Sequence, residues 1–193
     1  RFQHTEGARS GTATIDDFFL RRVRLGLTAR PDSEVTAKVS ADFAKGTVEL
    51  KDAFITFVPG GVSENGLALT LGQMNWPFGR EVPVSSSVRE CPERALWSRK
   101  LFEGERDLGF KVTSLAGRPY LLEVGAFNGT GLNKRDTNNA KDVVGRLGFT
   151  PASTVECGVS GYWGQARGLP VGSNTAVPRD LVKRRFGADL AWL

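Results

Sequence analysis

The chain has 193 residues, 40% of them hydrophobic, and its 26 Lys and Arg against 21 Asp and Glu give a formal charge of +5. No apolar run approaches the roughly 18 residues of a membrane-spanning helix, which excludes helical spans but not a barrel of strands that are apolar on one side. The single histidine, His4, excludes a His-based catalytic triad or a multi-histidine metal site. The basic balance leaves nucleic acid, an anionic surface and small anions as classes of partner.

Alternating residues begin in the segment "FFLRRVRLGLTAR". The cations Arg22 and Arg24 alternate there with Val23, Leu25 and Leu27. A helix would scatter these residues around its circumference, whereas a strand places the arginines on one face and the aliphatic groups on the other. The segment is therefore predicted to be a two-faced strand.

The same period recurs along the chain and predicts about nine or ten strands, with almost no helical periodicity. The expected strands are residues 1–6, 19–29, 35–43, 48–58, 67–74, 107–114, 120–127, 142–149, 155–163 and 183–193. In the segment 48–58, Leu50 and Ile55 have opposite parity, which predicts a β-bulge between them.

The connections differ in length. The stretches "RPDSE", "LAGRP" and "TPAST" are typical of tight turns, whereas residues 128–141 and 165–181 are long and rich in Gly, Asn or Arg. An up-and-down outer-membrane barrel has short turns at its periplasmic rim and long loops at the other. We therefore expect the three tight turns on the periplasmic side and the long segments at the opposite end. The early connections fit this pattern less well, because "AKGT" is short where a long loop is expected.

Six of the strands have a face without charge. In a soluble protein such faces would pack on one another, and in a membrane barrel they would meet lipid while the charged faces line water. Alternation alone allows both arrangements. The residues that the membrane arrangement places against lipid include Val23, Leu25, Leu27, Phe110, Val112 and Val159.

The longest break, residues 75–106, combines many arginines with several aromatic residues, with a possible helix cap at Ser87 and a helical turn over 93–101. Its apolar content predicts that it folds against the rest of the protein, as a loop that constricts the lumen. Arginine suits anion binding there because it stays charged and its planar fork matches phosphate oxygens. The candidate pore-lining, anion-binding residues are Arg22, Arg24, Lys38, Arg80, Arg89, Arg94, Arg99, Arg106 and Lys111.

The alternative for these cations is ion pairing. Five carboxylates of the same loop could neutralise its arginines: Glu81, Glu90, Glu93, Glu103 and Glu105. On the strands, Asp42 or Asp189 could do the same for Arg22 and Arg24. The two cysteines, Cys91 and Cys157, are expected to be free thiols.

The stretches "FFLRRVRLGL", "LTLGQMNWPFG", "SSSVRECPERAL", "GERDLGFKV", "VGAFNGTGLN" and "NNAKDVVGRLGFTP" occur in an order that resembles the phosphate-selective porin O and P family. The similarity covers residues 16–193, and "FNGTG" with "KDVVGRLGF" is its more specific part. The resemblance implies an outer-membrane β-barrel of about sixteen strands, usually trimeric, that conducts anions past a basic constriction. This chain would supply about half of those strands.

We therefore predict an all-β, antiparallel up-and-down transmembrane β-barrel or partial barrel. Residues 1–193 would form a single porin-type domain, a fragment of a longer barrel, with 75–106 as its constriction loop. The expected function is an outer-membrane porin that passes small anions, with phosphate as a candidate, in contact with outer-membrane lipid and as a homotrimer. No enzymatic activity, cofactor, metal or nucleic acid is expected. A non-conducting structural or anchoring barrel and a soluble basic β-protein that binds acidic ligands remain the alternatives.

Overall fold

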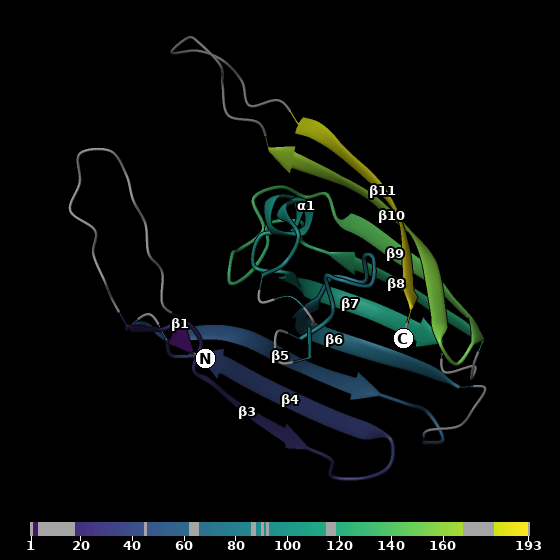
Figure 1. Ribbon diagram of the computed structural model, residues 1–193, viewed down its shortest axis with the longest axis horizontal. Coiled ribbons are helices and arrows are strands. Elements are labelled where there is room, and N and C mark those ends of the chain that lie inside the picture. Colours follow the sequence, from purple (N-terminus) through teal and green to yellow (C-terminus); the bar gives the residue numbers. More distant parts are fainter. Residues whose placement is uncertain are drawn as a thin grey trace.

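A single antiparallel sheet of nine strands dominates the computed structural model (Figure 1). The structure describes residues 2–3, 18–44, 46–61, 66–85, 88–89, 91, 93–114, 119–167 and 180–192. The sheet runs in chain order through β3 (Arg24–Ala29), β4 (Val35–Asp42), β5 (Glu49–Phe57), β6 (Leu67–Asn75), β7 (Arg106–Ser114), β8 (Tyr120–Phe127), β9 (Asp142–Ala152), β10 (Val155–Arg167) and β11 (Asp180–Trp192). Two short strands, β1 (Phe2–Gln3) and β2 (Phe19–Leu20), form a separate pair.

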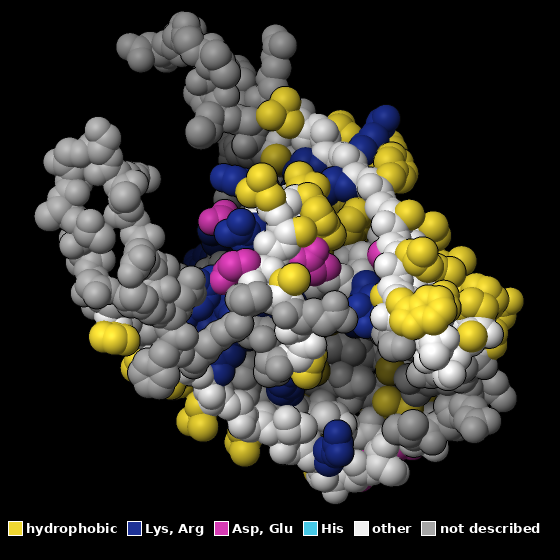
Figure 2. Space-filling model, viewed as in Figure 1, with side chains coloured by type: hydrophobic (Ala, Val, Ile, Leu, Met, Phe, Trp, Pro, Cys, Tyr) yellow, Lys and Arg dark blue, Asp and Glu magenta, His cyan; other side chains and the backbone are white. Residues whose placement is uncertain are grey.

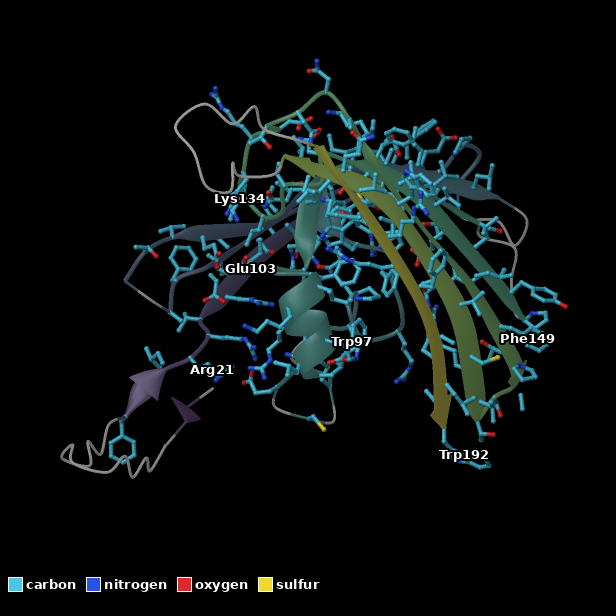
Figure 3. The ribbon with its side chains drawn as sticks, turned by 90° about the horizontal axis from the view of Figure 1, so that it is seen from above. Arg21, Trp97, Glu103, Lys134, Phe149 and Trp192 are labelled. Atoms are coloured by element: carbon cyan, nitrogen blue, oxygen red, sulfur yellow. The ribbon has the colours of Figure 1, made fainter. Side chains whose placement is uncertain are left out.

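Each strand of the large sheet pairs with its sequence neighbour, so β3 and β11 lie at the two edges and the sheet is not closed. The sheet is curved, and the loop between β6 and β7, with its helix α1 (Leu96–Leu101), lies on the concave side (Figures 1 and 3). The prediction of an all-β, up-and-down antiparallel arrangement is confirmed, in the form of an open sheet. No helix in the described part of the chain is long and apolar enough to cross a membrane.

The strand predicted over residues 19–29 is interrupted. It divides into β2 and β3, and Arg21, Arg22 and Val23 lie between them. The Asp42 carboxylate accepts hydrogen bonds from the Val23 N–H (3.2 Å) and from Arg24 Nε (3.1 Å), which secures the start of β3. The helical turn predicted over 93–101 is shorter in the structure, and the cap predicted at Ser87 lies outside the described residues.

The predicted bulge between Leu50 and Ile55 is confirmed. Asp52 lies opposite Ser40 and Leu50 lies opposite Ala41, so β5 has one extra residue, Lys51, at this point. The bulge changes the parity of β5 and directs Asp52 to the concave side, where the Ser40 hydroxyl donates a hydrogen bond to its carboxylate (2.7 Å).

The convex face of the sheet is apolar and exposed. Leu25 and Leu27 are 71% and 73% exposed, and Phe110 and Val159 are 47% and 56% exposed. Hydrophobic side chains continue along the outside of β10 and β11 (Figure 2). Soluble monomers rarely expose an apolar surface that extends over a whole sheet, because contact with water is unfavourable for each of these side chains. The face therefore requires an apolar surrounding, as lipid provides.

The concave face holds the core of the molecule. Trp76, Phe78 and Phe102 of the loop pack on Phe127 of β8 and Tyr162 of β10, and all five are at most 4% exposed. The ring centroids of Trp76 and Phe127 lie 4.6 Å apart, and those of Phe78 and Phe102 lie 4.7 Å apart. Aromatic contacts of this kind add to the free energy of burying large apolar side chains. The loop is therefore packed against the inside of the sheet, as its apolar content predicts.

The two ends of the sheet carry different connections. Because neighbouring strands are antiparallel, the turns at 30–34 and 153–154 share one end, which we call the short-turn rim. Connections 76–105 and 128–141 lie at the other end, the long-loop rim, where β10 also ends and β11 begins. The sorting has two exceptions, because the short connection 43–48 lies at the long-loop rim and the longer connection 58–66 lies at the short-turn rim. "RPDSE" and "TPAST" therefore share a rim as predicted, whereas most of "LAGRP" lies outside the described residues. Which rim faces the periplasm stays a prediction.

Candidate anion path

Charged side chains on the concave face form ion pairs across neighbouring strands. Lys111 Nζ of β7 lies 2.6 Å from a carboxylate oxygen of Glu123 on β8. Arg146 of β9 contacts Glu156 of β10 at 3.0 Å and Asp189 of β11 at 2.6 Å. The strand wall is therefore polar, but most of its charges are locally compensated.

Two of the predicted cations share one carboxylate. Arg106 Nε lies 2.7 Å from Asp52, with side-chain exposures of 6% and 9%. Lys38 Nζ lies 3.3 Å from the other oxygen of the same carboxylate, Asp52 Oδ2. A buried guanidinium that is paired in this way holds β7 to β5 across the root of the loop. The ion pair of Arg106 and Asp52 therefore serves the structure more than ion binding, because removal of one partner would leave a buried charge without compensation.

Arg94 holds the loop together from within. Its guanidinium is 4% exposed and pairs with Glu105 through two nitrogens, one of them at 2.8 Å. It also donates to the backbone carbonyls of Glu81 and of Val84 (2.8 Å). These contacts use the whole planar fork of the side chain, so Arg94 links both ends of the loop.

Three further predicted cations differ in their surroundings. Arg24 Nε lies 3.1 Å from Asp42, and Arg80 Nε of the loop lies 3.3 Å from Glu156 on β10. Arg99 projects from α1 into solvent and has no ion pair among the described residues. The pairing alternative thus describes Arg24, with Asp42, and Arg94 and Arg106, which both contact Glu105.

Arg22 and Arg89 differ from Arg99 because part of each guanidinium is buried, and neither forms an ion pair among the described residues. Arg22 Nη1 and Arg89 Nε and Nη1 are buried from solvent and have no hydrogen-bond partner in the described part of the chain. Burial and then the neighbouring charge of Arg21 lower the pKa of Arg22. Burial is the main cause that lowers the pKa of Arg89, and the neighbouring charges of Arg94 and Arg22 lower it further. Both groups nevertheless stay charged at physiological pH, because an arginine pKa lies far above it.

The two residues line separate cavities beside the loop. Arg22 lines a cavity of 610 Å³ together with Arg21, Arg24 and Glu105. Arg89 lines a cavity of 1040 Å³ between the loop and β11, with Trp97 of α1 on its wall. In Figure 3, Arg21 and Trp97 lie on opposite sides of α1. Arg21 forms an ion pair with Glu93, so that end of the chain is held against the loop.

A second long connection also reaches the first cavity. Asn133, in the segment between β8 and β9, donates to the carbonyl of Leu50 (3.0 Å) and accepts from Gln73 Nε2 (3.0 Å). Its backbone N–H donates in turn to Gln73 Oε1 (3.1 Å). The segment 128–141 thus crosses the concave side to β5 and β6. Its residue Lys134 is labelled in Figure 3, together with Glu103 of the loop between β6 and β7.

The structure therefore brings Arg22 and Arg24 together beside the loop and puts Arg89 within range of the charge of Arg22. Lys111 lies on β7, and Arg99 lies on the exposed side of α1. Sequence reasoning missed the contributions of Arg21 and Asn133 to the first cavity, whereas Glu105 was expected only as an ion-pair partner. The doublet "RR" in "FFLRRVR" is a signal that could have indicated Arg21. No pattern in the sequence indicates the contact between Asn133 and Gln73.

An antiparallel meander with an apolar convex face, a charged concave face and a long loop packed inside it has the features of a membrane β-barrel porin. The profile of the phosphate-selective porin O and P family matches residues 2–184 of the 193-residue chain. The chain therefore belongs to this family of porins, which places it in the outer membrane as a channel. No curated protein and no solved structure matches it.

Proposed function

We propose that the chain forms a wall of a porin that passes small anions, phosphate among them, by diffusion, and that Arg22 and Arg89 set its selectivity. The observation that carries this proposal is the pair of guanidinium groups with buried N–H groups that no described protein atom accepts. A buried donor without a partner is unfavourable, and an anion supplies the missing acceptor.

The local balance of charge favours anions. Around the root of the loop, Arg21, Arg24 and Arg94 are each paired with one carboxylate, that of Glu93, Asp42 and Glu105 respectively. Arg22 and Arg89 form no ion pair with a carboxylate among the described residues. Glu93 and Glu105 attract both groups from a greater distance, so the two positive charges are only partly compensated at this point. Such charges in a confined, partly desolvated passage attract anions and repel cations.

The other predicted residues have a weaker role in this proposal. Lys38, Arg80, Arg106 and Lys111 face carboxylates within 3.5 Å, so their charges cancel over short distances. Arg99 is exposed and contributes only to the potential at the mouth of the passage. We propose that the loop 75–106 constricts the lumen and holds Arg89 in the path of the ions.

The proposed surroundings follow from the same family. The convex face contacts outer-membrane lipid, and copies of the protein assemble as a trimer. Cross-linking of the protein in native membranes, followed by mass measurement, tests the trimer directly.

Conductance in planar bilayers tests the function. With a potassium chloride gradient across the membrane, we expect the reversal potential of an anion-selective channel and a reduction of the chloride current when inorganic phosphate is added. A cation-selective reversal potential would contradict the proposal. Insertion without any conductance would favour the structural, non-conducting barrel.

A further inference from the structure

The convex face of the sheet is uncharged over most of its extent, and Arg184 on β11 interrupts it. The pairing of β10 with β11 places Arg184 opposite Trp163 and in the same alternate row as Phe186 and Leu190, which are 84% and 79% exposed. Arg184 is itself exposed, and the other exposed outward-facing side chains that the structure describes carry no charge. The same two rows also contain Arg167 and Asp180, which lie opposite each other toward the long-loop rim. A cation on a lipid-facing surface calls for a specific counter-charge or for a position at the edge of the apolar layer.

The position of Arg184 along the strand corresponds to that edge. Trp192 ends β11 at the short-turn rim, where Phe149 also lies (Figure 3). Arg184 is eight residues before it. At about 3.3 Å per residue and a tilt of about 40°, this separation spans roughly 20 Å of depth, close to the height of about 25 Å of the apolar band on outer-membrane barrels. Arg184 and Trp163 therefore lie near the border of that band on the side of the long loops.

The geometry of the pair leaves the arginine able to bind an anion. The guanidinium carbon of Arg184 lies 4.1 Å from the centroid of the Trp163 ring, whose side chain is 53% exposed. A guanidinium that stacks on an aromatic face keeps its N–H edge free for two parallel hydrogen bonds to a phosphate. Tryptophan is itself the residue that prefers the boundary between apolar chains and polar headgroups.

We propose that Arg184, held by Trp163, binds the phosphate group of a phosphorylated lipid in the outer leaflet. Long loops of outer-membrane barrels face the cell exterior, so the predicted orientation of the two rims puts the outer leaflet at this border. A lipid headgroup is favoured over a free phosphate ion, because the apolar side chains of Phe186 and Leu190 continue below Arg184 along the same row and can contact acyl chains. The proposal rests on the membrane placement of the convex face and is independent of the selectivity of the pore.

Binding of fluorescently labelled lipid A to the full chain in detergent micelles tests the proposal. We expect Arg184→Gln to raise the apparent dissociation constant roughly tenfold or more, because charge-assisted hydrogen bonds are lost. Trp163→Leu should weaken binding by a smaller factor, and Arg30→Gln, a matched change of an exposed arginine at the short-turn rim, should leave binding unchanged. Lipid A without its phosphates should bind only weakly to the wild-type protein. Its affinity should equal that of intact lipid A for Arg184→Gln.

Three results would overturn the proposal. Equal affinity of the wild type and Arg184→Gln would remove the arginine from the site, and equal affinity for dephosphorylated lipid A would remove the phosphate. Complete displacement of lipid A by millimolar inorganic phosphate would assign the site to a free anion instead. Folding is not in doubt for Arg184→Gln, since the change removes a charge from an apolar face, and the heat-modifiable mobility of the barrel on gels verifies it. Conductance of the same variant should match that of the wild type, so a failure of anion selectivity is separable from a failure of lipid binding.

Discussion

Replacement of both partly compensated arginines, as Arg22→Gln with Arg89→Gln, should abolish most of the anion selectivity. These two guanidinium groups are the cations at the root of the loop that lack a carboxylate partner in the described part of the chain, and their buried N–H groups donate to no protein atom there. The double variant therefore removes two positive charges from the root of the loop. The fold should persist, because neither side chain makes an ion pair that holds the loop.

The magnitude follows from the distance at which an anion would bind. A unit charge about 4 Å from a guanidinium gains about 1 kcal/mol in a medium as polar as water, and more where water is partly excluded. Because the two groups line separate cavities, each acts on its own ion. An anion beside either group gains about 1 kcal/mol and a cation at the same place loses as much, so the free energies of anion and cation occupancy differ by at least about 2 kcal/mol before screening, which corresponds to roughly thirtyfold. Screening at moderate salt reduces this value, so a loss of roughly tenfold in the permeability ratio is expected at 0.1 M.

Reversal potentials across a tenfold gradient of potassium chloride measure this ratio in single-channel recordings. The difference between the double variant and the wild type should shrink at 1 M salt, where the screening length falls to about 3 Å. Arg30→Gln, at the short-turn rim, is the matched control for a lost charge, and Arg22→Lys with Arg89→Lys should retain selectivity because the charges remain. An unchanged reversal potential in the double Gln variant would refute the reasoning and assign selectivity to another part of the molecule.

Three further outcomes follow from the same structure. Phe110→Arg on the convex face should reduce the free energy of folding into lipid vesicles by about 2–4 kcal/mol in a urea titration, whereas Phe110→Leu should change it little. Arg106→Gln leaves the buried Asp52 carboxylate with only a weaker partner, and a loss of about 3 kcal/mol in the same titration is expected. The hydrogen bond from Lys141 lowers the pKa of Asp136 in the segment between β8 and β9, so this carboxylate stabilises the segment above the unfolded pKa of about 3.9 and loses that effect as the pH falls through the folded value. An NMR titration should show this low midpoint, and Lys141→Gln should raise it.

Local features of this protein were decided by the sequence alone. Strand alternation is a property of the backbone over a few residues, so the two faces around Leu25 and Phe110 were predictable from the order of the side chains. The bulge in β5 was predictable for the same reason, because Leu50 and Ile55 can share a face only if one residue is added between them. The apolar residues of the long loop also indicated that it packs against the protein.

The partners of the arginines were decided by the tertiary structure. Arg106 meets Asp52 across 54 positions of sequence, and Asn133 meets Gln73 across 60. The loop offers several carboxylates of similar chemistry to each arginine, and the pairing energies are comparable until the path of the backbone fixes the distances. The register of the strands and the packing of Trp76 on Phe127 supply that path. They pair Arg94 with Glu105 and leave Arg22 and Arg89 without a carboxylate among the described residues, because electrostatic pairing acts over a few ångströms and depends on where the folded chain brings each charge.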